Sequence, residues 1–133
     1  MRKAAFETEA FRIDAAPDAA FPLCDPLEDD SPDDALLITS ARRLQRLAII
    51  AAETGARFAR DGIAHDAAAW MLAPRRLFGG RPAITACMER PHFGRALLLH
   101  GLSLGLDAEP ADVDDLLADA SIRIWLRNTK SVA

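Results

Sequence analysis

Residues 70–82 constrain the fold more than any other stretch, because a helical pattern ends before them and another begins after them. Pro74 prevents a regular continuation of the preceding helix, and Gly79 and Gly80 allow backbone angles that other residues rarely adopt. Pro82 suits the first turn of a new helix. We therefore predict a built turn between two helices, in which the structural residues are Trp70, Pro74, Gly79, Gly80 and Pro82.

Charge divides the 133-residue chain into two parts. Residues 1–35 carry three basic and ten acidic side chains, a balance of −7, so the remainder carries +3 of the overall net charge of −4. Four of the eight prolines also lie before residue 35, and this composition opposes long helices. We predict an extended, acidic, proline-rich arm over residues 1–34 and a helical domain over residues 35–133.

The arm also contains large apolar side chains. Two interpretations stay open for it: a segment that docks on the body or on a second subunit, and a mobile tail. The side chains concerned are Phe6, Phe11, Ile13, Phe21, Leu23 and Leu27.

Helical spacing dominates the remainder, so we predict an all-α fold, a small bundle of about five helices. The longest pattern begins at Asp33 or Asp34 and ends near Arg60, with Leu37, Leu44 and Leu47 among its inward residues and arginines 42, 43 and 46 on its outer side. Further helices are predicted over residues 64–72, 82–90, 92–106 and 111–119. The leucine-rich helix over residues 92–106 is expected to be the central helix or an interface helix. Residues 121–127 fit either a helix or an extended segment.

Several function classes lack support in the sequence. Cys24 and Cys87 form no paired motif, which favours a reducing compartment, and the cytoplasm is expected. No apolar run reaches the roughly 20 residues that a membrane span requires, so a soluble protein is expected. The cysteine and histidine spacings match no standard zinc pattern, so we predict no metal and no cofactor. Cys87 and His92 lack an orienting third group, so we predict a core cysteine, no catalytic residues and no enzyme.

Two places have the composition of a partner-binding surface. Arg75, Arg76 and Arg81 surround the predicted turn and suit an acidic partner surface. Near the C-terminus, Trp125 is either a partner anchor or a residue that closes the core, since tryptophan and arginine are enriched among binding hot spots.

The sequence around the turn resembles a known family. The run Ala67-Ala68-Ala69-Trp70-Met71-Leu72, a proline turn and Leu77-Phe78-Gly79-Gly80-Arg81-Pro82-Ala83-Ile84 resemble the toxin-binding domain of MbcA/ParS/Xre-type antitoxins, over about residues 40–106. This chain departs from the family at Phe78, where a small residue or leucine is usual, and it lacks the threonine normally found between the arginine and the proline. The family's common N-terminal helix-turn-helix domain is replaced here by the acidic arm, so direct DNA binding is not implied.

The resemblance implies a bacterial antitoxin that binds a RES-domain toxin, a type that depletes NAD, and occludes its active site. It implies a homodimer, a protein partner and no catalysis by the antitoxin itself. The partner-binding residues that we expect from the turn and from the C-terminal segment are Arg75, Arg76, Phe78, Arg81, Trp125 and Arg127. The alternatives are a nucleic-acid-associated transcriptional regulator and an orphan helical interaction domain with a different partner.

Overall fold

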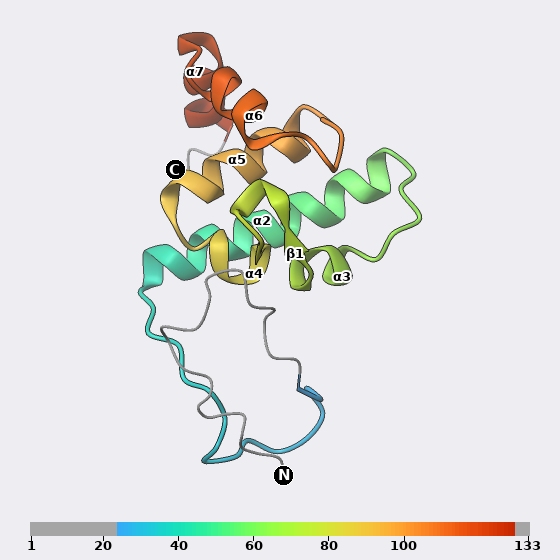
Figure 1. Ribbon diagram of the computed structural model, residues 1–133, viewed down its shortest axis with the longest axis vertical. Coiled ribbons are helices and arrows are strands. Elements are labelled where there is room, and N and C mark those ends of the chain that lie inside the picture. The colour runs from blue at the N-terminus through green and yellow to red at the C-terminus, as the bar shows by residue number, and fades with distance from the viewer. Residues whose placement is uncertain (1–23, 130–133) are drawn as a thin grey trace.

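The computed structural model describes residues 24–129, and this part of the chain is mostly helical (Figure 1). The all-α class predicted from the sequence is confirmed. Six α-helices and one short hairpin occur within the described range. In chain order the elements are α2 (Ala41–Arg60), α3 (Ala67–Leu72), β1 (Pro74–Arg75), the 3-10 turn η1 (Arg76–Phe78), β2 (Arg81–Pro82), α4 (Ala83–Ala86), α5 (Arg90–Gly101), α6 (Pro110–Leu117) and α7 (Ala120–Thr129).

Helix α2 begins at Ala41, several residues later than the predicted start at Asp33 or Asp34. The hydroxyl of Ser40 accepts a hydrogen bond from the backbone N–H of Arg43 at 3.3 Å, which satisfies one of the free donors of the first turn. The prediction was wrong because upstream residues have no surface against which a helix face would be buried, and packing supplies most helical stability. Leu37, expected inside, is therefore exposed.

The described part of the acidic arm is extended and exposed. From Cys24 to Ser40 every residue is exposed and none is helical, which agrees with the predicted arm and extends it by six residues beyond position 34. Leu27 is among these exposed residues. The other apolar arm residues, Phe6, Phe11, Ile13, Phe21 and Leu23, lie outside the described residues.

The predicted helix over residues 82–90 is wrong, because a turn divides that stretch. Helix α4 ends at Ala86, the backbone N–H groups of Cys87 and Met88 bond back to Ala83 and Thr85, and α5 begins at Arg90 with Pro91 in its first turn. Proline suits this position because the first N–H groups of a helix have no intrahelical acceptor.

Helix α5 ends five residues before the predicted end at Leu106. Ser103 adopts a left-handed backbone angle (φ 52°), which ends the helix after Gly101. The downstream leucines, Leu104 and Leu106, then pack against the core from a loop. The predicted helix was too long because, in the sequence, apolar leucines in a loop cannot be distinguished from apolar leucines in a helix.

Helix α5 is the centre of the bundle. It packs most extensively on α2, while α6 and α7 pack on its other side (Figure 1). Leu97, Leu98 and Leu99 are buried by the chain's own helices, so the central role is confirmed and these residues offer no free dimer surface. The core contains mostly apolar side chains from every layer: Ile50, Phe58, Trp70, Met71, Leu77, Phe78, Ala83, Ala86, Cys87, Ala96, Leu97, Leu98, Leu99 and Val113.

The two remaining helices complete the C-terminal end. Helix α6 covers residues close to the predicted 111–119 and places Val113 in the core. Residues 121–127, which fitted a helix or an extended segment, belong to helix α7. Its apolar residues Ile122, Trp125 and Leu126 are partly buried against the core.

Arg57 is a buried cation that fastens α2 to the end of α5. Its side chain is 5% exposed and donates hydrogen bonds to the carbonyl oxygens of Leu99 (3.2 Å) and Leu104, and its Nε lies 3.2 Å from Asp61 Oδ2. Arg57 lies in the last turn of α2, where a cation complements the helix dipole. Its hydrogen bonds additionally close the loop after α5.

Replacing Arg57 by methionine should therefore destabilise the fold by about 2–4 kcal/mol, because two carbonyl groups lose a charged donor and Asp61 loses one of its two arginine partners. The matched control is Arg60→Met, which removes a half-exposed arginine that bonds to His100 O at 2.8 Å. We expect it to cost less than about 1 kcal/mol. Urea unfolding of both variants measures the difference, and equal costs would contradict the role given to Arg57.

Candidate partner-binding surface

The predicted turn is a small hairpin with a fixed backbone. Strands β1 and β2 pair antiparallel, with Pro74 opposite Pro82 and Arg75 opposite Arg81. Between the strands, the N–H of Gly80 donates to the carbonyl oxygen of Arg75 at 2.9 Å. Sequence analysis predicted a turn between helices but no strand pairing. Pro74 is the first residue of the hairpin, directly after α3 and its cap, and Pro82 is the last, directly before α4.

Glycines make this hairpin possible. Gly79 and Gly80 have φ angles of 68° and 91°, in the left-handed region that residues with a side chain rarely adopt. The chain thereby reverses direction directly after η1, and Leu77 and Phe78 of η1 are directed into the core. Phe78 is 1% exposed, so the partner-binding role predicted for it is withdrawn. Its ring instead packs edge-on against Trp70, with centroids 6.1 Å apart.

The three arginines of the turn have different environments. Arg75 lies over the Trp70 ring at 5.2 Å and donates from Nε to the Trp70 carbonyl oxygen at 3.2 Å. Burial lowers the pKa of Arg75 below its ordinary value. Arg81 pairs with Glu89 at 2.9 Å and is only 24% exposed. Arg76 pairs with Glu109 but is 76% exposed, so it is the arginine of this turn that best reaches a partner.

A further arginine, Arg95, joins the turn to the rest of the bundle. It binds Asp114 of α6 through two hydrogen bonds of 2.8 and 2.7 Å, and it donates to the carbonyl oxygen of Leu77 at 3.1 Å. The hydrogen bond from Arg95 holds the pKa of Asp114 below its ordinary value. The turn is therefore clamped to α5 and α6 and does not depend on local backbone bonds alone.

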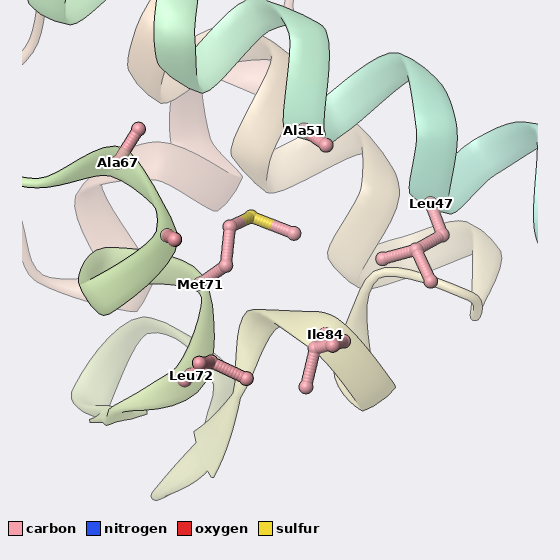
Figure 2. A pocket seen from close by; sticks show the side chains of 7 residues that line it. Leu47, Ala51, Ala67, Met71, Leu72 and Ile84 are labelled. Carbon is pink, nitrogen blue, oxygen red and sulfur yellow. The ribbon is translucent and has the colours of Figure 1, made fainter. Parts of the chain in front are cut away.

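An apolar groove opens beside the turn, between α2, α3 and α4 (Figure 2). Its volume is about 450 Å³, and its lining is almost entirely apolar. Figure 2 shows the Met71 side chain projecting between α2 and α4, with Leu47 and Ile84 at one end and Ala67 at the other. The lining residues are Leu47, Ala51, Ala67, Ala68, Met71, Leu72 and Ile84.

The C-terminal helix contributes a second exposed region. A Cβ atom on Gly101 would lie 2.5 Å from the Trp125 ring, so this tryptophan is seated on α5 where a glycine leaves room for it. Trp125 is only partly buried, and its neighbour Ile124 is 54% exposed. Arg127 is exposed on the same helix. Of the two interpretations of Trp125, its contact with the core favours the closing residue.

Comparisons of the chain with models of protein families, with curated proteins and with solved structures found no match. Among the described residues, no helix is long and apolar enough to cross a membrane. Over the same range, 24–129, no group of three or more His, Cys, Asp or Glu side chains is placed to hold a metal ion.

Cys87 and His92 do not form a nucleophile and base pair. Cys87 is fully buried, as expected for a core cysteine, and burial raises the pKa of its thiol to about 12. Its Sγ lies 4.0 Å from the backbone carbonyl oxygen of His92, and the His92 ring packs edge-on against Phe78. A thiol with this pKa remains protonated near neutral pH and is a poor nucleophile.

Sequence reasoning missed the groove and misplaced two arginines of α2, Arg43 and Arg46, which are both partly buried. Arg46 was assigned to the outer side of α2, yet it donates to the carbonyl oxygen of Met88 at 2.9 Å and lies partly buried. The groove gave a weak sequence signal, because its walls include the alanines Ala51, Ala67 and Ala68, which are common on both buried and exposed helix faces. The run of three alanines before Trp70 is the only indication of it.

Proposed function

We propose that this chain is an antitoxin-like protein-binding domain that neutralises a RES-type, NAD-depleting toxin by occluding its active site. The observation that supports it most directly is the clamped hairpin, in which the residues behind the family resemblance hold Arg76 outward and contribute Leu72 and Ile84 to the apolar groove. A fixed backbone lowers the conformational cost of binding a partner. Arginine is enriched among binding hot spots, and exposed apolar surface on the same domain offers further contact area to a partner.

We further propose the cytoplasm as its location and a homodimer as its assembly. The partner surface comprises Arg76 on the turn and Arg127 on α7, and it suits acidic side chains on the toxin. Arg75 and Arg81 support the turn from behind through Trp70 and Glu89. The protein has no catalytic step in this proposal, and operator binding is not part of it.

Co-expression of the full chain with the product of the neighbouring gene tests this proposal. The full chain should restore growth and copurify with the toxin. Arg76→Glu and Arg127→Glu should each weaken the complex by roughly tenfold or more, because a repulsive charge replaces an attractive one. The charge-matched control is Arg42→Glu, an exposed arginine in the first turn of α2.

Three results would count against the proposal. Absence of a complex with the encoded toxin, together with continued growth arrest, would overturn the antitoxin function. Binding that decreases steeply with salt, to nucleic acid and not to a toxin, would support the regulator instead. An unchanged complex for both arginine variants would remove the turn and α7 from the interface.

A further inference from the structure

Three consecutive large apolar residues stand in solvent immediately before α2. Leu36, Leu37 and Ile38 are 89%, 57% and 98% exposed. Figure 1 shows this stretch leaving the start of α2 and running away from the helices. A run of exposed apolar residues is unusual on a monomeric surface and marks an interaction site or an aggregation hazard. We refer to residues 36–38 as the apolar run.

The apolar groove provides a complementary surface on the same chain. Its α2 wall is formed by Leu47 and Ala51, and Leu44, one helical turn before Leu47, is 50% exposed. Arg43 lies one helical turn before Leu47, so the stretch of α2 that leads to the groove carries a basic residue. Within the described residues the Nε of Arg43 is buried without a hydrogen-bond partner.

Charge distinguishes between the possible occupants. Asp29, Asp30, Asp33 and Asp34 precede the apolar run and are exposed, while Arg43 precedes the groove residues of α2 by one helical turn. An apolar segment with an acidic flank thus matches an apolar groove with a basic flank. Each chain carries both halves of this match.

The apolar run of each chain does not occupy the groove of the same chain, since Leu36, Leu37 and Ile38 are all exposed. The hydroxyl of Ser40 caps α2, and Thr39 Oγ1 lies 3.5 Å from Met88 Sδ. These contacts hold Thr39 and Ser40, the two residues that follow the apolar run, at the start of α2. A second copy can supply the run without disturbing them, and a twofold axis lets both runs and both grooves be used at once.

We infer that the chain forms a twofold homodimer in which the apolar run of each copy occupies the apolar groove of the other. This inference deepens the proposed homodimer and rests on it, but it does not depend on the identity of the toxin. It also assigns a role to the acidic arm, whose carboxylates approach Arg43 of the second copy. The leucines of α5 take no part, since they are buried within each copy.

Sedimentation equilibrium of the full chain tests this interface with four variants. Ile38→Asp alters the run and Ala51→Glu alters the groove, and both positions are exposed, so neither change should disturb the core. Each should weaken dimerisation by roughly 100-fold, because the twofold axis doubles the loss of buried apolar contact. The matched controls, Leu27→Asp in the arm and Ala59→Glu on another part of α2, should dimerise as the unchanged chain does.

A mixture of the two interface variants tests whether the apolar run of one copy binds the groove of another copy or the groove of the same copy. Ile38→Asp retains an intact groove and Ala51→Glu retains an intact run, so a mixed dimer keeps one complete junction. We expect the mixture to associate more tightly than either variant alone. Failure of the mixture to associate would overturn the exchange, as would a monomeric unchanged chain.

The failures of the two proposals remain distinguishable. A dimer that persists in both variants would place the interface elsewhere while leaving a homodimer intact. Toxin binding, measured separately with the same variants, reports on the antitoxin function whatever the oligomeric state proves to be.

Discussion

Trp70→Ala is expected to lower the free energy of unfolding by about 3–5 kcal/mol, the usual cost of emptying a buried aromatic site. Trp70 is fully buried, and its ring packs edge-on against Phe78 and against His100, whose centroid is 4.6 Å away. It also supports the Arg75 guanidinium. The substitution therefore removes a contact between α3, the hairpin and α5 at once.

The control for this prediction is the second tryptophan. Trp125 is partly buried and lies on α7, so Trp125→Ala should cost less than half as much as Trp70→Ala. Urea unfolding followed by circular dichroism measures both variants without relying on tryptophan fluorescence. A loss below about 1 kcal/mol for Trp70→Ala would contradict its place in the core. A larger loss for Trp125→Ala would make α7 the main source of stability.

The sequence predicted the turn because its signals are local. Proline and glycine restrict or enlarge backbone freedom whatever surrounds them, so Pro74 and Gly79 were assigned their roles without knowledge of the fold. The large ring of Trp70 was placed correctly beside them, since a tryptophan directly before a turn is readily buried by it. The class of fold followed in the same way from helical spacing.

The start of α2 was predicted wrongly, and Phe78 was assigned to the partner-binding residues although it is buried, because tertiary packing decides both features. Leu37 and Leu47 both fit the helical spacing of apolar residues, yet only Leu47 packs against the core. Phe78 follows two arginines in a turn, and its neighbours alone do not show that η1 directs it inward. A local pattern reports which faces are apolar but not which of them another element covers.

The charged residues show the same limit. Arg57 and Arg60 both suit the end of a helix, and their different burial depends on the path of the loop after Gly101. His100 falls within a leucine-rich helix and gave no sign of its surroundings. It is nevertheless fully buried, and in the described part of the chain neither ring nitrogen has a hydrogen-bond partner.

This histidine should make stability depend on pH. Burial first, and then the nearby charges of Arg57 and Arg60, lower the pKa of His100 from 6.5 to about 4. In the unfolded chain the same group takes up a proton near its ordinary pKa, so between these values the unfolded state binds more protons. The contribution of His100 is therefore fully present above about pH 6.5 and is lost as the pH decreases toward 4. The total loss is about 3 kcal/mol.

Denaturant unfolding between pH 7 and pH 4 measures this loss, and His100→Phe is the control. Phenylalanine keeps an aromatic ring beside Trp70 but cannot be protonated. Between pH 7 and pH 4 the free energy of unfolding of the variant should therefore decrease by about 3 kcal/mol less than that of the unchanged chain. His92 contributes in the same direction, since burial first lowers its pKa too, and it is present in both proteins. The difference between the two curves therefore isolates His100, and parallel curves would show that His100 does not titrate between the two states.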